Sequence, residues 1–481
     1  MKAVSIILVI EFVFLLYFLG LQGVYLCLNL ISLFTLPRYM QLRVINELPQ
    51  TCSEFDPPIS VIVPAYNEEA IIVSCVRSLL QLSYSEFELV VVNDGSKDQT
   101  LEVLRQEFNL ISFPEAYRVR LPTKPVKGIY VSTTYPNLRV IDKENGGKAD
   151  SMNVGINAAR CPLFCVIDSD SILQHCSLQM AVQPFLEDPR TVACGGTIRI
   201  ANGCQVRGGF LERAELPANP LALFQVAEYL RSFLFGRLGW SSINALLIVS
   251  GAFGLFHKET VVSVGGFNLN TLGEDMELIM RLHRVLIERR VPYRIAFVPD
   301  PLCWTEAPED LRTLRSQRVR WQHGLGDCVM LNRGLLFKRG SGLVGWVALP
   351  FFLVFEWLGP VLEVLGYVFV VVTYLLGLLS FASALLFLLL AIGMGMLLSV
   401  SSLLLEELSF RTYPKMRHIL LLFVVAIAEN FGYRQLNSYW RVVGLVKWLV
   451  GRKPAWGEMK RTADWQAETS AERMGEGGTV K

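Results

Sequence analysis

Residues 163–170 read Leu-Phe-Cys-Val-Ile-Asp-Ser-Asp, and this stretch decides the fold. Its apolar run predicts a strand buried on both faces, as in a parallel sheet. Asp168 and Asp170 follow at the carboxyl end of that strand, which is where ligands bind in such sheets. Two close carboxylates attract a hard divalent cation, which in turn holds a diphosphate. An isolated Asp-x-Asp more often marks a strand running into an Asx-turn, so its neighbouring motifs decide the interpretation.

The composition indicates a membrane protein with a globular part. Of the 481 residues, 52% are hydrophobic and only 18% are charged, which is too apolar for a wholly soluble chain. The formal net charge is +2, and no basic stripe is interleaved with aromatic residues, so we expect no nucleic-acid partner. The 10 cysteines lack zinc spacing, and we expect reduced, packed thiols.

Apolar segments flank the globular part. Residues 4–36 predict one long, tilted transmembrane helix, and Arg38 and Arg43 after it place the next segment on the cytoplasmic side. From residue 343 the chain predicts three or four further helical segments, where Gly359-Pro360 fits either a hairpin or a kink. The predicted domains are a transmembrane helix at 1–37, a cytoplasmic domain at 57–330, transmembrane or interfacial helices at 342–436, and a cytoplasmic basic tail at 437–481.

Between these segments, strands alternate with helices, which predicts an α/β fold with a mostly parallel, doubly wound sheet. A proline-broken insertion at 110–137 is expected to be irregular. Successive strands end in polar, acidic loops on one edge, the layout of a nucleotide-sugar site. The predicted strands are 59–63, 88–92, 138–141, 163–167 and 191–200, and the predicted helices are 68–81, 99–107, 149–159 and 276–289.

The loop at 144–148 holds two adjacent glycines before Lys148 and a helix start. Glycines let backbone N–H groups approach a phosphate, and the lysine adds a point charge. A plain turn between strand and helix is an equally good interpretation. The small-residue segment Ser250–Gly254 is either a loop that lets an acceptor approach or a tight turn.

Three segments toward the end of the predicted domain have structural interpretations that need no catalytic role. Gly273-Glu274-Asp275 opens a helix, where acidic residues also suit the helix dipole. Residues 309–325 predict a basic amphipathic helix that would lie on anionic headgroups. A helix within 217–248, with polar points such as Glu228 and Arg231, is expected along the membrane surface or under the sheet.

The motifs occur in a specific order. They are Val63–Glu68 (Val-Pro-Ala-Tyr-Asn-Glu), Asn93–Ser96 (Asn-Asp-Gly-Ser), Gly147-Lys148, Asp168-Ser169-Asp170, Gly273-Glu274-Asp275 and Gln317–Trp321 (Gln-Arg-Val-Arg-Trp). This set closely resembles membrane-bound glycosyltransferases of family 2, the group of cellulose, chitin, hyaluronan and poly-N-acetylglucosamine synthases. The resemblance covers about residues 57–330 and implies a GT-A-like nucleotide-sugar-binding domain. One departure is Gly273, where the family usually has threonine or glutamate; both acidic residues after it are present.

The resemblance implies roles for the donor side. Asp94 would hold the uracil or ribose of a UDP-sugar, and Lys148 would contact the base or the diphosphate. Asp168 would hold the nucleotide and, with Asp170, Mg²⁺ or Mn²⁺. The loop beside the nucleotide would contribute Ala65, Asn67 and Glu68.

The resemblance also implies the acceptor side. Asp275, with Glu274 beside it, would be catalytic, and Asp275 would act as the general base on the acceptor hydroxyl. Gln317, Arg320 and Trp321 would line the acceptor and diphosphate side. Direct attack inverts the sugar carbon, so a UDP-α-sugar would give a β-linkage.

The implied function is processive β-polysaccharide synthesis coupled to export, in a multi-pass protein of the bacterial inner membrane whose catalytic domain is cytoplasmic. The implied partners are a UDP-sugar, a polysaccharide or lipid acceptor, and membrane lipids. Transfer of a single sugar to a lipid acceptor remains the alternative, and a non-enzymatic transporter or scaffold would leave the ordered acidic loops unexplained. The residues do not distinguish UDP-glucose from UDP-N-acetylglucosamine.

Overall fold

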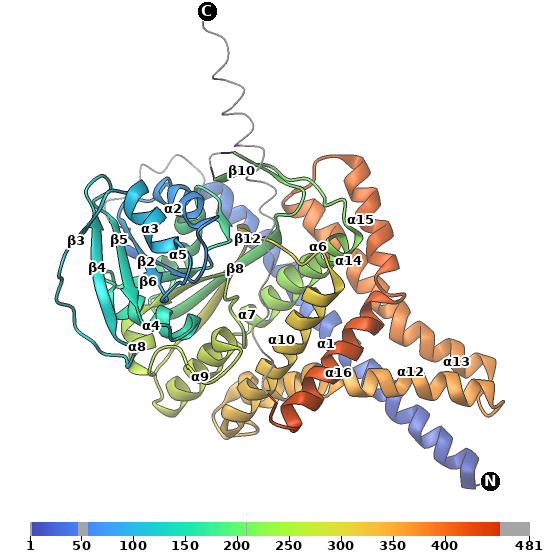
Figure 1. Ribbon diagram of the computed structural model, residues 1–481. Coiled ribbons are helices and arrows are strands. Elements are labelled where there is room, and N and C mark those ends of the chain that lie inside the picture. Colours follow the sequence, from blue (N-terminus) through green and yellow to red (C-terminus); the bar gives the residue numbers. More distant parts are fainter. Residues whose placement is uncertain (1, 47–55, 208, 453–481) are drawn as a thin grey trace, which may run out of the picture. The chain divides into compact units, whose positions relative to one another are not determined.

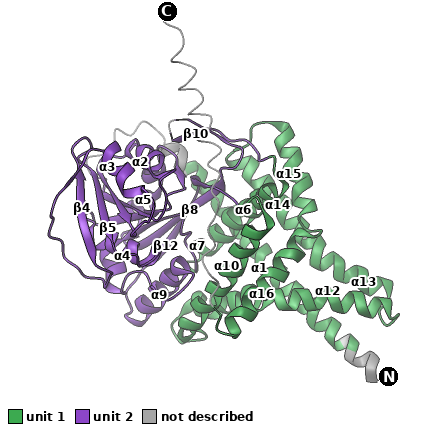
Figure 2. Ribbon diagram, viewed as in Figure 1, with its two compact units in different colours: residues 1–42, 218–245, 308–458 green, residues 43–217, 246–307, 459–481 purple. Residues whose placement is uncertain are grey.

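The computed structural model describes residues 2–46, 56–207 and 209–452 (Figure 1). They form two compact units (Figure 2). Unit 1 comprises residues 1–42, 218–245 and 308–458, and unit 2 comprises residues 43–217 and 246–307. The helices at both 218–245 and 308–330, which the sequence assigned to the catalytic domain, therefore group with the apolar helices. The predicted tail starts inside a helix, and its residues 453–481 lie outside the described residues.

Unit 2 is built on a 10-stranded mixed sheet with a parallel centre, which confirms the predicted fold class. Strands β5, β2, β1 and β6 lie side by side and run parallel, and every residue of β6 is buried. In their order across the sheet, the strands are β3 (Leu110–Ser112), β4 (Val126–Ser132), β5 (Leu138–Lys143), β2 (Phe87–Asn93), β1 (Ile59–Ala65), β6 (Leu163–Ile167), β11 (Phe253–His257), β8 (Thr191–Ile200), β12 (Arg294–Thr305) and β7 (Ile172–Leu173).

The antiparallel strands of this sheet differ from the sequence prediction. The insertion 110–137, expected to be irregular, contains β3 and β4, which extend the sheet beyond β5 in antiparallel pairing. Strand β11 lies antiparallel between β6 and β8, so Phe253 and Gly254 belong to a strand and not to the expected loop. Strand β12 was missed because Pro299 and Pro301 interrupt its pattern; the register against β8 shifts at Pro301.

Helices flank the sheet of unit 2. Helix α4 packs on β1, and a Cβ atom at Gly155 would lie 2.3 Å from the Ile62 side chain, so the helix approaches this closely only because residue 155 is glycine. The helices are α2 (Ile72–Leu80), α3 (Thr100–Glu107), α4 (Lys148–Ala158), α5 (Ser177–Glu187), α8 (Lys258–Ser263) and α9 (Glu274–Glu288), and a small separate sheet pairs β9 (Gln205–Arg207) with β10 (Phe210–Arg213).

Unit 1 is helical. Its elements are α1 (Lys2–Asn46, which extends past the unit boundary), α6 (Pro220–Arg231), α7 (Leu238–Ser242), α10 (Leu311–Leu331), α11 (Leu349–Phe351), α12 (Gly359–Leu375), α13 (Phe381–Leu388), α14 (Met394–Ser409), α15 (Met416–Ala428) and α16 (Tyr433–Leu449), with π-helical or 3₁₀ stretches η1 (Ser232–Arg237), η2 (Arg333–Leu335), η3 (Val344–Ala348), η4 (Phe352–Trp357) and η5 (Leu389–Gly393). Side chains such as Phe12, Phe34 and Leu375 stay exposed on these helices, as expected of surfaces that face lipid.

By length and composition, two helices among the described residues are apolar enough to cross a membrane, at Val9–Gln41 and Phe381–Ser409. Two bent pairs raise this number to up to four if each pair is one span. The first pair, Val344–Trp357 with Gly359–Leu375, bends by 46° at the proline that the sequence left as a hairpin or a kink. A bend of that size is a kink, because the chain direction does not reverse.

The polar side chains of α6 pair inside unit 1. Glu228 accepts two hydrogen bonds from Arg318 on α10, at 2.6 and 2.8 Å, and one from the Tyr433 hydroxyl at 3.0 Å. Arg231 forms an ion pair with Glu429 on α15. These pairs tie Glu228 and Arg231 of α6 to other segments of unit 1.

Candidate functional site

Four loops leave the carboxyl ends of the parallel strands β1, β2, β5 and β6 in unit 2. Because neighbouring parallel strands end at the same edge, these loops form one surface, as the sequence predicted. The loop residues that the sequence singled out are Ala65, Asn67 and Glu68 after β1, Asp94 after β2, Lys148 after β5, and Asp168 and Asp170 after β6.

The loops after β1 and β2 hold each other in place. Asn67 adopts a left-handed backbone conformation (φ 56°), its side-chain oxygen accepts a hydrogen bond from Lys97 N at 2.9 Å, and its N–H donates to Ser96 Oγ. The Glu68 N–H donates to Thr100 Oγ1 at 2.8 Å. The side chain of Asn67 is therefore used to shape the loop, and a contact of this residue with a nucleotide would come through its backbone or its amide nitrogen.

The carboxylate of Asp94 is fully engaged by the loop after β5. Its Oδ1 accepts hydrogen bonds from Lys143 Nζ at 2.5 Å and Gly146 N at 2.9 Å. Its Oδ2 accepts from Gly147 N at 2.8 Å and Asn145 Nδ2 at 3.2 Å. An ionised carboxylate has about four acceptor positions, and all are used here. Of the two interpretations that the sequence left open for this loop, the plain turn describes this structure, since both glycine N–H groups donate to Asp94.

Lys148, the first residue of α4, joins the acidic groups of the site. Its ammonium forms an ion pair with Asp168, lies 3.9 Å from Glu274 Oε1 and hydrogen-bonds the Gly251 carbonyl at 3.3 Å. Burial alone would lower the pKa of Lys148, but the carboxylates of Asp168 and Glu274 raise it to about 12. Lys148 is therefore a permanent cation beside the Asp-x-Asp motif.

Asp275, in the first turn of α9, is oriented by two hydrogen bonds from backbone N–H groups. Its Oδ2 accepts from Gly251 N at 2.9 Å and its Oδ1 from Met276 N at 2.8 Å, whereas the N-cap residue of α9 is Gly273. A Cβ atom at position 251 would lie 3.3 Å from Lys148 Nζ, tighter than most Cβ contacts, and 3.4 Å from Asp275 Oδ2. The predicted small-residue segment thus brings its backbone against the candidate base.

Glu274 and Asp275 also border a small cavity whose other walls are mostly apolar, including Val166, Phe256 and Phe267. Burial, and then the charge of Asp275, raise the pKa of Glu274 against the lowering effect of Lys148. Shifted pKa values of this kind cluster at functional sites. The arrangement distinguishes the two adjacent acids, with Glu274 held by the lysine and Asp275 by backbone N–H groups.

His283 fixes the far end of the same helix. Its Nε2 lies 2.8 Å from the Leu246 carbonyl and its Nδ1 lies 2.6 Å from the Tyr293 hydroxyl. Burial lowers the pKa of His283 to about 4. Together with the bond between Gly251 and Asp275, this contact clamps α9 to the segment that precedes β11. His283 could not be singled out from the sequence, because a buried histidine on an apolar helix face belongs to no motif.

The neutral state of His283 should make the folding of unit 2 sensitive to acid. Its pKa is lower in the folded chain than the ordinary value of 6.5, so the stabilisation is complete above pH 6.5 and is lost as the pH falls through about 4. The full loss is roughly 3 kcal/mol at 1.36 kcal/mol per pKa unit. Between pH 7 and pH 4, the Tm measured by thermal unfolding should decrease less for His283→Gln than for the unmodified chain. Glutamine does not titrate, and it still donates a hydrogen bond to the Leu246 carbonyl. Equal decreases in both proteins would contradict this assignment.

The candidate metal residues are a partial donor set. Within the described part of the chain, no group of three or more histidine, cysteine, aspartate or glutamate side chains is placed to hold a metal ion. Two carboxylates fit a Mg²⁺ or Mn²⁺ ion whose coordination is completed by substrate phosphates, which is the usual way Mg²⁺ is bound. Asp168 and Asp170 therefore suit an ion that arrives with a nucleotide diphosphate.

Gln317, Arg320 and Trp321 lie on α10 in unit 1. Gln317 is buried, and its side-chain oxygen accepts no hydrogen bond from any described residue. Trp321 is 42% exposed, and the Arg318 guanidinium lies over its ring, 4.7 Å from the centroid. Arg318, expected on the basic side of this helix, is instead buried and paired with Glu228. This ion pair holds the guanidinium in place against one face of the Trp321 indole.

Cys161 and Cys165 were expected to be reduced, packed thiols. All nine described cysteines are free; Cys165 is buried, Cys161 is partly buried, and burial raises the pKa of both thiols.

Two family models match this chain. The one described as glycosyl transferase family 2 matches residues 60–212, and the one described as glycosyl transferase family group 2 matches residues 163–398. The chain belongs to the family 2 glycosyltransferases, as its motifs predicted, and unit 2 has the GT-A-like fold.

The chain is similar to polysaccharide synthases of this family. A poly-beta-1,6-N-acetyl-D-glucosamine synthase of Staphylococcus aureus (strain COL) is 28% identical over 266 residues, which cover 55% of this chain and 54% of the relative. Its counterpart from Staphylococcus epidermidis is 27% identical over 267 residues, with the same coverage. The chain thus spans about half the length of the curated relatives it matches. Among solved structures, mannosyltransferase PcManGT from Pyrobaculum calidifontis, in complex with GDP-Man and Mn²⁺, is 18% identical with a TM-score of 0.49 over 91% of this chain and 99% of its own.

Proposed function

We propose that this protein transfers a sugar from a UDP-sugar to a growing polysaccharide, with inversion at the sugar carbon, as a processive synthase that exports its product. The observation that carries the proposal is the convergence in unit 2 of Lys148 on Asp168, Glu274 and the backbone of Gly251, which in turn holds Asp275. A cation, a candidate metal-binding carboxylate and a candidate base are thus connected by ion pairs and hydrogen bonds. Membership of family 2 supplies the reaction class.

The donor side would work by electrostatics. Asp168 and Asp170 would hold Mg²⁺ or Mn²⁺, and the ion would stabilise the charge that develops on the leaving diphosphate. Lys148 now neutralises Asp168, and its ammonium would move to the diphosphate when a metal takes over that carboxylate. The loop of Ala65, Asn67 and Glu68, held rigid by the loop after β2, would form the wall beside the base.

The acceptor side would supply the proton transfer. Asp275 would remove the proton of the attacking hydroxyl, and the Gly251 N–H keeps its carboxylate aimed. Because the attack is direct, a UDP-α-sugar would give a β-linked product. Since the relatives are named as poly-β-1,6-N-acetylglucosamine synthases, UDP-N-acetylglucosamine is the first donor to test.

The apolar helices of unit 1 would span a bacterial inner membrane several times and contact its lipids. The sheet domain would then face the cytoplasm, where nucleotide sugars are made, and the arginines that follow the first span agree with this orientation.

The proposal is tested by incubating the purified protein in lipid nanodiscs with Mn²⁺ and either UDP-N-acetylglucosamine or UDP-glucose. We expect UDP release with one donor and a ladder of long products. Products limited to one added sugar on lipid would favour the single-transfer alternative, and no UDP release with any nucleotide sugar would overturn the enzyme assignment.

Trp321 provides a second test, because its exposed indole either anchors the chain at the membrane or stacks on a sugar ring. One ring face is covered by the Arg318 guanidinium, which leaves the other for an apolar sugar face. We expect Trp321→Ala to reduce polymer synthesis about tenfold or more, the scale of a lost stacking contact of 1–2 kcal/mol, with UDP affinity unchanged. Trp321→Leu should fail to restore synthesis. Full activity of the leucine variant would identify a membrane anchor.

A further inference from the structure

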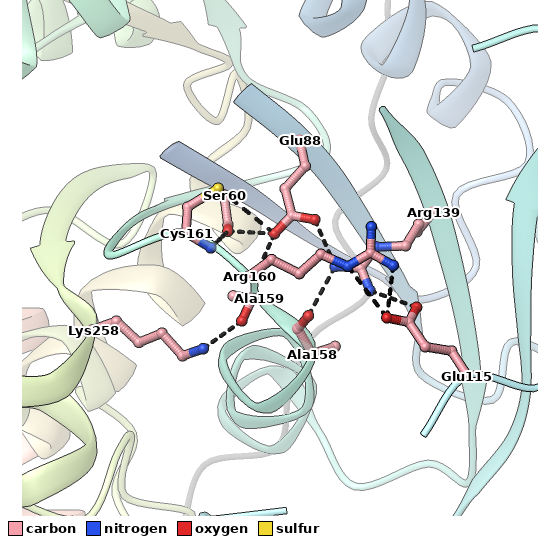
Figure 3. Close-up of polar contacts among 9 residues, drawn as sticks. All are labelled: Ser60, Glu88, Glu115, Arg139, Ala158, Ala159, Arg160, Cys161 and Lys258. Carbon is pink, nitrogen blue, oxygen red and sulfur yellow. Dashed lines mark hydrogen bonds and ion pairs between the residues drawn. The ribbon is translucent and has the colours of Figure 1, made fainter. Parts of the chain in front are cut away.

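Strands β2 and β5 are connected by a buried ion pair at each end. Near the amino ends, Arg139 of β5 pairs with Glu88 of β2 at 2.6 Å (Figure 3). At the carboxyl ends, Lys143 of β5 pairs with Asp94, directly after β2, at 2.5 Å. Both cations are almost completely buried, with side-chain exposures of 3% and 0%. The two pairs have the same setting in the sheet, but only the second lies at the edge that carries the site.

The amino-end cluster holds backbone and strands together. Arg139 bridges two carboxylates, since it also pairs with Glu115 at 2.9 Å, and it donates to the Ala158 carbonyl at 2.8 Å (Figure 3). Glu88 accepts further hydrogen bonds from Ser60 Oγ and the Arg160 N–H. None of these residues belongs to the loops that leave the carboxyl ends of the strands, so this cluster serves the frame of the sheet.

The carboxyl-end cluster holds the loop that leads to Lys148. Lys143 also bridges two carboxylates, because Asp150 lies 2.7 Å from its Nζ, and its ammonium donates a hydrogen bond to the Glu144 carbonyl at 2.6 Å. Lys143 thus makes two hydrogen bonds and a second ion pair inside the chain. Asp94, held by Lys143, accepts both glycine N–H groups immediately before α4.

Close packing makes this arrangement specific. A Cβ atom at Gly146 would lie 2.5 Å from the Asp150 carboxylate, and one at Gly95 would lie 2.8 Å from Asn145 N. Gly147, the N-cap of α4, has a φ of 88°, which other residues rarely adopt. The loop therefore has one tight conformation around the Lys143 charge, and that conformation sets where α4 begins.

We propose that Lys143, together with Asp94 and Asp150, is a positioning group for donor binding. Lys143 fixes the carboxylates, Asp94 fixes the two glycine N–H groups, and the loop places the Lys148 ammonium toward the diphosphate of the nucleotide. Asp94 thus also acts on the donor through the loop. This inference rests on the proposed nucleotide-sugar function, because it assigns Lys148 to the diphosphate.

The matched pair of cations allows a direct test. Lys143→Met and Arg139→Met each remove one buried cation of β5. The first leaves the buried carboxylates of Asp94 and Asp150, and the second leaves buried Glu88 and partly buried Glu115, so both should lower the Tm of the purified full-length protein. UDP binding is then measured by calorimetry with Mn²⁺. We expect the UDP Kd of Lys143→Met to rise about tenfold or more, the scale of one misplaced charge-assisted contact, and that of Arg139→Met to stay within about twofold of the unmodified chain.

Hydrogen exchange without nucleotide separates this inference from the proposed function. Amides in a peptide covering residues 144–150 should exchange faster in Lys143→Met and at the unmodified rate in Arg139→Met. Equal UDP Kd values for the two variants, or unchanged exchange at 144–150, would overturn the positioning role. Absence of UDP binding by the unmodified protein would instead overturn the proposed function, and with it the donor part of the inference.

Asp150→Asn keeps the test decisive if Lys143→Met does not fold. Asparagine retains the shape beside Gly146 and leaves Lys143 paired with Asp94, so the chain should fold. The UDP Kd should still rise, by less than in Lys143→Met, and exchange at 144–150 should still quicken. No change in either measurement would mean that the cluster only stabilises the sheet.

Discussion

Replacing Asp275 by asparagine is expected to lower kcat by roughly 10²–10⁴, the usual contribution of a general base, and to leave the UDP Kd near its original value. Asparagine can still accept the hydrogen bond from Gly251 N through its amide oxygen, although its amide nitrogen cannot accept the one from Met276 N, so the main loss is the proton acceptor. The two quantities come from single-turnover kinetics and from calorimetry with UDP and Mn²⁺.

The matched control is Glu277→Gln, on the same first turns of α9. Glu277 is buried and pairs with Arg281 at 2.8 Å, so its replacement should lower the Tm without removing the base. If Asp275→Asn kept activity within a few-fold of the original, the acidic start of α9 would serve only the helix dipole, the alternative that the sequence left open. If both variants lost activity equally, the loss would reflect damage to α9.

Residues at the ends of the central strands could be predicted from the sequence, because a buried parallel strand is a local signal. The apolar run of β6 ends at Ile167, and Asp168 and Asp170 follow directly in the turn at its carboxyl end. The same logic placed Lys148, one residue after the loop that follows β5. In these cases the chemistry and the strand that presents it are contiguous in the chain.

The carboxyl-end cluster of Lys143, Asp94 and Asp150 could not be predicted in this way. Asp142, Lys143 and Glu144 follow one another and look like a solvated loop, yet Lys143 is fully buried. Its partner Asp94 is 49 residues away and meets it only because β2 and β5 are neighbours in the sheet. The sequence left the two glycines open between phosphate binding and a plain turn for the same reason, since the acceptor of their N–H groups in this structure follows another strand.

Two further differences have the same origin in long-range pairing. Strand β11 contains Gly254, and its assignment depends on partners in β6 and β8. Arg318 fits the outer face of an amphipathic helix by spacing, but Glu228, 90 residues earlier, offers it a bidentate partner in the interior of unit 1. Periodicity describes one element at a time and carries no information about a charge on another element.

The metal-binding carboxylates should give the second large effect. Asp170→Asn is expected to abolish the Mn²⁺-dependent part of UDP binding and to lower turnover by roughly 10³-fold or more, the scale of several kcal/mol of charge stabilisation by a metal ion. The described residues provide no third side-chain ligand here, so the loss of one carboxylate cannot be compensated by the protein. UDP calorimetry with and without Mn²⁺, and UDP release from the sugar donor, measure the two parts separately.

The control is Asp188→Asn, which removes a carboxylate that is paired with Arg190 at 2.8 Å after α5 and has no part in the strand-end loops. It should leave both measurements unchanged. Asp168→Asn should differ from both variants, because Asp168 neutralises Lys148 before substrate arrives. The loss of the Asp168 carboxylate should weaken the Mn²⁺ dependence of UDP binding. It should also leave the Lys148 ammonium, no longer neutralised by Asp168, to attract UDP without metal. Unchanged UDP affinity of Asp170→Asn in the presence of Mn²⁺ would remove the metal from the donor site and leave Lys148 as the main group facing the diphosphate.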